Sequence, residues 1–146
     1  MTRQVGDIGN DNKNISAMKT KSGPFQQECE MEWQDAGEGV KRQIMGYDGQ
    51  LMVVKVKFET GAVGTPHTHY HSQATYVAKG KFELNIGGQR KVLKEGDGYY
   101  VEPDVEHGCV CLEEGILIDT FSPMREDFLR LQNLSEIFQG GFYFIY

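Results

Sequence analysis

HTHYHSQATYVAKG, residues 67–80, is the most informative stretch of this chain. Side chains alternate across an extended backbone that rises about 3.3 Å per residue, so His67 and His69 would lie about 6.6 Å apart on one face of a strand. Two imidazoles at that separation can converge on one metal ion. A third histidine, His107, ends the later turn-rich segment GDGYYVEPDVEH. Three histidines with a fourth polar group are the minimum for an open metal site.

Composition narrows the class of protein. The 146 residues are enough for one domain, and 39% hydrophobic with 25% charged residues is ordinary for a soluble globular protein. A net charge of -6 argues against nucleic acid or an anionic membrane surface as a partner. The amino terminus has no apolar leader, and no run approaches the roughly 18 apolar residues of a membrane span. We therefore expect a cytoplasmic protein with reduced cysteines.

The pattern along the chain favours an all-β fold. Residues 1–24 are polar and show no helical or strand period, so we expect a flexible arm there. Short alternating segments follow, broken by Gly, Asp or Pro, as in a sandwich or barrel. Gly87-Gly88 suits a two-residue hairpin turn. The expected strands cover residues 51–59, 74–79, 81–86, 90–93, 99–101, 108–112 and 116–121.

The carboxyl-terminal part predicts a short helix and a docking tail. Ser122-Pro123 resembles a helix entry, with a capping hydroxyl and proline at the first helical position, and Phe128 recurs with Leu131 and Leu134 at helical spacing. The chain ends QGGFYFIY, which would promote aggregation if exposed. It either pairs with a sheet edge of its own subunit or docks on a second copy, and we expect a homodimer. The expected organisation is an arm at 1–24, a barrel at 25–130 and a tail at 131–146.

Two segments resemble the two motifs of the cupin family. The first motif, G(x)5HxH(x)3-4E(x)6G, matches Gly61, His67, His69 and Gly80, with Gln73 in place of the usual Glu. The resemblance implies a small jelly-roll β-barrel with a short helix after it and a metal ion in its lumen.

The second motif, G(x)5PxG(x)2H(x)3N, fits with more departures. It matches at Gly96 and His107, but Glu102 and Asp104 stand at the PxG positions and Cys111 replaces the usual Asn. The metal-binding histidine is thus present in a turn of irregular sequence.

A narrower resemblance concerns the cupins of pectin and alginate breakdown, which convert 4,5-unsaturated monouronates into linear keto sugars. The pattern HxHxHxQ at 67–73, followed by IDTFSPMREDFL at 118–129, is similar to theirs. This resemblance implies a metal ion held by three His and one Gln, with an Asp, a Phe and an Arg lining the pocket. The implied metal ligands here are His67, His69, Gln73 and His107, and the implied catalytic residues are Asp119, Phe121 and Arg125.

Each of these residues also has a simpler interpretation. Gln73 is either a neutral metal ligand, which would leave a divalent ion its full charge and attract anions, or a side chain that only forms hydrogen bonds with the backbone. Asp119, on one strand face with Phe121, either moves protons near neutral pH or forms a buried salt bridge or loop cap. Arg125 either captures a carboxylate with its planar fork or stays solvated.

Other side chains lie near the same motif. His71 has the parity of His69, so it either binds the metal, supports the ligands from beside them, or faces substrate. Cys109 and Cys111 share the parity of His107 and act either as small buried hydrophobes or as thiolate ligands.

The leading functional hypothesis is a metal-dependent enzyme that opens and ketonises 4,5-unsaturated uronates, a class of small anionic sugar acid. It would use one divalent ion, Zn, Ni, Fe, Mn or Co, which His and Gln ligands do not distinguish. The alternatives are a non-catalytic sugar- or metal-binding cupin, and an iron-dependent dioxygenase.

Overall fold

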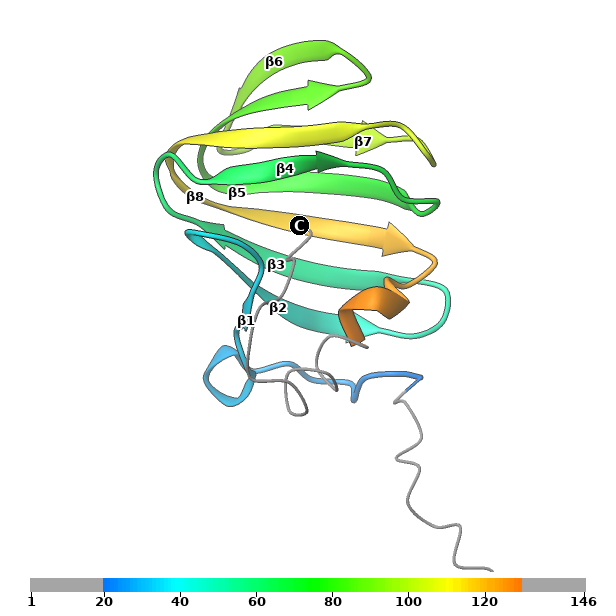
Figure 1. Ribbon diagram of the computed structural model, residues 1–146. Coiled ribbons are helices and arrows are strands. Elements are labelled where there is room, and N and C mark those ends of the chain that lie inside the picture. Colours follow the sequence, from blue (N-terminus) through cyan, green and yellow to red (C-terminus); the bar gives the residue numbers. More distant parts are fainter. Residues whose placement is uncertain (1–19, 130–146) are drawn as a thin grey trace, which may run out of the picture.

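The computed structural model describes residues 20–129, and the arm up to residue 19 and the tail from residue 130 lie outside them. The described part is an antiparallel sheet preceded by a short 3-10 helix, η1 (Glu28–Glu30), and followed by a helical turn that begins at residue 126 (Figure 1). Within residues 20–129, no helix is long and apolar enough to cross a membrane. The strands are β1 (Gln34–Asp35), β2 (Val40–Tyr47), β3 (Met52–Phe58), β4 (Val63–His67), β5 (Ser72–Ile86), β6 (Gln89–Lys94), β7 (Gly98–Val101) and β8 (His107–Ser122).

The two long strands organise the whole sheet. Its order is β1-β2-β3-β8-β5-β6, with β4 paired to β8 and β7 paired to β5. The first half of β8 pairs with β4 and its second half with β3, while β5 follows β8 along its full length. The β5–β8 ladder shifts register between Val77 and Phe82, where the sheet bends. The all-β jelly-roll expected from the sequence is therefore confirmed, and the bend brings both ends of β8 to one mouth of the barrel.

The core lies between the two halves of the bent sheet. On β3, Met52, Val54, Val56 and Phe58 alternate with outward-facing residues and are almost completely buried, as the period of two predicts. From the opposite half, the ring of Phe82 packs edge-to-face on Phe58, with ring centroids 5.2 Å apart. Burial of these apolar side chains is the main favourable contribution to folding.

Several element boundaries differ from those that the sequence predicts. The expected strands 74–79 and 81–86 form one strand, β5, and 108–112 and 116–121 form one strand, β8. The chain bends at these points without leaving the ladder, so a local glycine marks a bulge here and not a turn. The hairpin at Gly87-Gly88 is confirmed, because both residues have the positive φ, 56° and 83°, that such a turn needs.

Three strands were missing from the sequence prediction: β1, which is only two residues long, β2 and β4. In β2, the polar side chains of Arg42 and Gln43 are buried, which hides the alternation of apolar and polar residues. In β4, Gly64 and Pro66 interrupt the pattern of a strand that makes few pairs of its own.

The helical turn after β8 starts later than expected. Ser122 is the last residue of β8, and its hydroxyl donates to the Gln50 carbonyl at 2.8 Å, so Ser122 is not available as a cap. The helix begins at residue 126 and buries Phe128. The expectation that Pro123 is the first helical residue is thus wrong, and Leu131 and Leu134 lie outside the described residues.

Candidate metal centre

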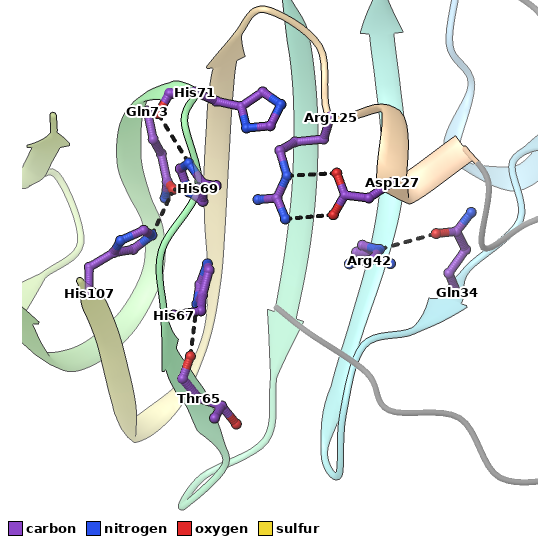
Figure 2. A network of polar contacts seen from close by, with 10 residues as sticks. All are labelled: Gln34, Arg42, Thr65, His67, His69, His71, Gln73, His107, Arg125 and Asp127. Atoms are coloured by element: carbon purple, nitrogen blue, oxygen red, sulfur yellow. Dashed lines mark hydrogen bonds and ion pairs between the residues drawn. The ribbon is translucent and has the colours of Figure 1, made fainter. Parts of the chain in front are cut away.

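Three histidines meet at the mouth of the barrel. His67 ends β4, His69 lies in the loop before β5, and His107 begins β8. One ring nitrogen of each lies within 4.8 Å of the others (Figure 2). His67 and His107 are partners in the β4–β8 ladder. The expectation that His67 and His69 share a strand is wrong, because β4 ends at His67, but the loop still directs both rings to one point.

Backbone carbonyls fix the orientation of all three rings. The Nδ1 atom of each histidine lies at hydrogen-bond distance from a carbonyl oxygen: 2.8 Å from Thr65 for His67, 3.1 Å from His71 for His69, and 2.9 Å from Val105 for His107. A neutral ring that donates through Nδ1 keeps a lone pair on Nε2. Carbonyl partners of this kind also hold histidine ligands in metal sites.

Gln73, buried on β5, completes the cluster. Its amide nitrogen donates to Thr75 Oγ1 at 3.1 Å and lies 3.5 Å from Asp119 Oδ1. Its oxygen Oε1 therefore faces the histidines, 2.9 Å from His69 Nε2 and 3.1 Å from His107 Nε2. With both rings donating through Nδ1, three acceptor atoms face one another here, an arrangement that a cation between them would stabilise.

Burial favours the neutral form of these imidazoles. Burial, with smaller contributions from the nearby His107 and Arg125, lowers the pKa of His67 to about 4 against the opposing effect of the Thr65 carbonyl. Burial is also the main cause of the lowered pKa of His69 and of His107. The rings are therefore neutral at pH 7, which is the form that binds metal ions.

Asp119 and Phe121 lie beside the histidines on the second half of β8. The Asp119 side chain is buried, and Oδ1 accepts a hydrogen bond of 2.6 Å from Thr75 Oγ1. Phe121 is buried as well, and its ring stands edge-on to His69 with centroids 5.6 Å apart. A carboxylate thus lies next to Gln73, at the edge of the candidate metal site. Thr75, which was not predicted from the sequence, holds it there.

Arg125 is buried and paired rather than solvated. Its Nε and Nη2 donate to the two carboxylate oxygens of Asp127 at 3.0 and 2.8 Å (Figure 2). Its guanidinium lies over the rings of Phe121 and Phe128. Burial raises the pKa of Asp127, but the hydrogen bonds and charge of Arg125 outweigh burial and leave it below its ordinary value. Asp127 was not predicted as the partner of Arg125, although REDF places it two residues after the arginine.

A cavity of about 290 Å³ lies between Arg125 and one member of the histidine cluster, His69. Its volume lies at the lower end of the range of about 300–1,000 Å³ that is usual for ligand pockets. It is lined by Thr68, His69, Tyr70, His71, Arg125, Glu126 and Asp127.

The buried cysteines are protonated thiols. Burial raises the pKa of Cys109 to about 12 and also raises that of Cys111. Within the described part of the chain, the cluster that could hold a metal ion consists of His67, His69 and His107 and includes no cysteine. This favours the interpretation of Cys109 and Cys111 as small buried hydrophobes.

Comparison with known proteins places the chain in a family. It matches the cupin domain over residues 54–119. It is 51% identical over 102 residues to the pectin degradation protein KdgF of Dickeya dadantii strain 3937, covering 68% of this chain and 93% of that protein.

Solved structures agree with this match. An RmlC-like cupin from Shewanella frigidimarina NCIMB 400 has a TM-score of 0.73 and 50% identity, covering 75% of this chain and 98% of that structure. KdgF from Halomonas sp. has a TM-score of 0.70 and 42% identity, covering 73% and 99%. From its fold, its histidine cluster and these matches, we conclude that the chain belongs to the cupin family and is related to its pectin-degradation members.

Proposed function

We propose that this protein is a metal-dependent enzyme that converts 4,5-unsaturated uronates into linear keto sugar acids. The observation that carries the proposal is the position of Gln73 Oε1, within 3.1 Å of Nε2 of both His69 and His107, next to the buried carboxylate of Asp119. The relationship to proteins named for pectin degradation supports a uronate as the substrate.

The proposed metal ligands are His67, His69, Gln73 and His107. All four are uncharged at neutral pH, so the set leaves a divalent ion its full charge in a partly dry lumen. Such an ion, whether Zn, Ni, Fe, Mn or Co, supplies Lewis-acid polarisation of a bound oxygen. A strongly positive site of this kind also suits an anionic substrate.

Arg125 and Phe121 would position the sugar. The bond to Asp127 occupies two nitrogens of the guanidinium, and Nη1 is left to donate to the carboxylate of the uronate. The ring of Phe121, buried between His69 and Arg125, offers an apolar surface for one face of the sugar. Holding the substrate in one orientation lowers the entropic part of the barrier.

Asp119 would move the proton. It accepts the proton of the anomeric hydroxyl, and the C1 carbonyl forms as the bond between C1 and the ring oxygen breaks. Asp119 then returns the proton to C4 as the enolate becomes a ketone. The product is an isomer of the substrate, so no oxidant or further reactant is needed. Thr75 holds the Asp119 carboxylate in place by a hydrogen bond of 2.6 Å. A general acid-base group of this kind typically contributes about 10²- to 10⁴-fold to the rate.

The test uses unsaturated galacturonate or mannuronate freshly released by a lyase. Loss of the absorbance of the 4,5 double bond is followed with metal-analysed protein and compared with a sample without enzyme. We expect acceleration by the protein, and we expect Asp119→Asn to lower it about 100-fold or more at unchanged metal content. Thr120→Val, a change on the opposite face of β8, is the matched control.

Three results would contradict the proposal. Retained turnover in Asp119→Asn would contradict proton transfer by Asp119. Binding of uronates without any product would indicate a non-catalytic binding protein. Consumption of oxygen with the sugar would indicate a dioxygenase.

A further inference from the structure

The outer face of one half of the sheet carries exposed apolar side chains. Alternate residues of β5 and of the second half of β8 point into the barrel, so the residues between them point outward. Tyr76 on β5 and Tyr100 on β7 are 51% and 57% exposed, and Ile116 and Ile118 on β8 and Val53 on β3 are half-buried on the same face. The strands β3, β8 and β5 lie side by side there (Figure 1). These five residues, the apolar patch, form a surface of the kind that marks an interaction site.

The apolar patch has charges of opposite sign at its two ends. At one end, Lys57 and Lys79 lie on either side of Ile116 in one row across β3, β8 and β5. At the other end, Glu102 directly follows β7 and Asp48 lies in the turn before β3, and both are exposed. An apolar centre within a charged rim is the usual anatomy of a protein–protein interface.

The outer face of the other half of the sheet is less suited to contact with a partner. Val63 and Val110 pair there and are exposed, but the same row continues with Glu83 and then Val92. A carboxylate in the middle of such a surface would lose its water on contact, which is costly unless the partner supplies a cation.

The apolar patch is small for an interface. Toward β2 it ends at Lys55, which forms an ion pair with Glu28 at 2.7 Å. Four strands spaced about 4.8 Å apart, and the 7 residues of β3 at about 3.4 Å each, give a face of about 19 Å by 24 Å. This area of about 450 Å² is below the roughly 800 Å² per partner of a standard interface, so it fits a reversible complex better than a permanent one.

The two exposed tyrosines alternate with small residues. In the β5–β7 ladder, Tyr76 lies opposite Gly98 and Tyr100 lies opposite Ala74. Each tyrosine therefore has a small residue two positions away on its own strand and on the same face. A two-fold axis that lies in the interface and crosses the strands exchanges these positions between two copies. It places Tyr76 of each copy over Ala74 of the other, and Tyr100 over Gly98.

The same axis brings the lysine end of each copy to the acidic end of the other. Lys79 of one copy then approaches Glu102 of the second copy, and the contact occurs twice. A two-fold interface requires this kind of self-complementary surface. An acidic saccharide on the same face would meet the lysines but would be repelled by Glu102 and Asp48, so a second copy matches the charges better.

We propose that the apolar patch is the interface of a reversible homodimer, in which Tyr76 and Tyr100 of each copy pack on the small residues of the other. Gln73 and Asp119 point to the inner side of the same strands, so this contact leaves the mouth of the barrel open. The inference does not depend on the proposed function, because it involves neither the metal site nor the substrate.

Sedimentation velocity of the full chain tests the proposal. We expect the wild type to change from monomer to dimer as its concentration rises through the micromolar range. Tyr76→Ser and Tyr100→Ser should each raise the dissociation constant about tenfold or more, since a few aromatic anchors carry most of the binding free energy of an interface. Val92→Ser, which removes a 49%-exposed apolar side chain outside the patch, is the matched control.

Ala74→Tyr distinguishes a specific fit from non-specific apolar association. More apolar surface would strengthen non-specific association. If Ala74 instead leaves space for Tyr76 of the second copy, the larger side chain should weaken the dimer about tenfold or more. Ala74 is exposed, so the variant should fold, and circular dichroism checks this.

An exchange of charges tests the orientation of the two copies. Lys79→Glu and Glu102→Lys should each weaken the dimer about threefold, because like charges then face each other across the interface. The double variant should dimerise more tightly than either single variant. No such recovery is expected if the two ends lie apart.

A measurement on the wild type does not depend on any variant folding. Hydroxyl-radical labelling is compared at concentrations below and above the dissociation constant. We expect labelling of Tyr76 and Tyr100 to slow in the dimer. Tyr70, which is 56% exposed and lies outside the patch, should be labelled at the same rate in both samples and is the internal control.

The following outcomes would overturn the inference. One is a wild type that stays monomeric at all concentrations, including one that binds an acidic oligosaccharide on this face. Another is a dimer that keeps its affinity in Tyr76→Ser, Tyr100→Ser and Ala74→Tyr but is lost when residues 130–146 are removed, which would place the contact in the tail. Equal labelling of all three tyrosines in monomer and dimer would also exclude the apolar patch.

Discussion

At the scale of single residues, the hydroxyl of Thr75 connects the candidate metal ligands to the candidate base. It accepts a hydrogen bond of 3.1 Å from the amide of Gln73 and donates one of 2.6 Å to Asp119. All three side chains are buried. Thr75 therefore determines which end of the Gln73 amide faces the histidines.

We expect Thr75→Val to weaken metal binding about 10- to 100-fold, as is typical when a group that orients a ligand is removed. Valine keeps the shape of threonine but can neither donate nor accept, so the Gln73 amide loses a partner that fixes its orientation. Competition with a chromophoric chelator measures the affinity. The exposed Thr120→Val is the control, and equal affinity of the two variants would show that the orientation of Gln73 does not affect binding.

Much of the site could be predicted from residue spacing, but its hydrogen bonds could not. The positions of His67, His69 and His107 follow from a motif, and the structure brings them together as expected. The roles proposed for Gln73, Asp119, Phe121 and Arg125 stay predictions, although all four line one region. Thr75 acts through Asp119, 44 residues away in the sequence, and no local pattern reveals such a contact.

At the scale of elements, the bend shared by β5 and β8 gives the barrel its shape. Gly80 lies at this bend with φ +83°. A Cβ atom added there would lie 2.5 Å from the carbonyl oxygens of Glu113 and Glu114 on β8. The close approach of the two backbones thus requires glycine at this position.

We expect Gly80→Ala to destabilise the protein by about 3 kcal/mol or more, since it combines backbone strain with a clash against backbone atoms that cannot move aside. Urea unfolding monitored by circular dichroism gives the free energy of unfolding. Gly49→Ala is the control, because a Cβ at Gly49 would meet nothing within 4 Å. Similar stability in the two variants would mean that the bend can relax.

The same bend explains why some strands could be predicted correctly from the sequence and others could not. Alternation located β3 and β6 well, because each is regular along its length. The breaks expected near residue 80 and residue 114 are real, but they mark bulges inside long strands, which only the ladder between β5 and β8 reveals. Sequence patterns describe a local backbone and do not say whether pairing continues across an irregular residue.

At the scale of the whole molecule, a bound metal would tie together parts of the chain that are distant in sequence. Its proposed ligands come from the end of β4, the loop after it, β5 and the start of β8. An ion that binds only the folded state stabilises that state, by about 2.7 kcal/mol when its free concentration is 100 times its dissociation constant.

We expect removal of the metal to lower the temperature of unfolding, and the metal-free protein to lose further stability as the pH falls. The folded state holds the pKa of His67 near 4, below the ordinary value of 6.5, so between these values the unfolded chain binds a proton that the folded chain does not. The stability contribution is complete above pH 6.5 and is lost toward pH 4.

Scanning calorimetry of metal-free and zinc-loaded protein at pH 7 and pH 5 provides the measurement. Higher stability of the metal-free protein at pH 5 would contradict the sign of this effect. If adding a chelator to the zinc-loaded protein leaves its unfolding temperature unchanged, the proposal of a metal site is contradicted.

Some expectations about the whole molecule stay predictions. The homodimer was inferred from the apolar tail, and residues 130–146 lie outside the described residues. The flexible arm was expected over residues 1–24, of which the structure describes only 20–24, and Ser22 there exchanges hydrogen bonds with Tyr47 on β2.

The central place of β8 has a consequence for how the protein is made. Because β8 pairs with β3, β4 and β5, the sheet cannot close until residues 107–122 have been synthesised. Nascent chains can fold only what has left the ribosome, and long-range strand pairing is slow. A ribosome that stops before His107 would therefore release a product with no closed barrel and an incomplete histidine cluster. Metal loading must then follow synthesis of β8, which carries His107.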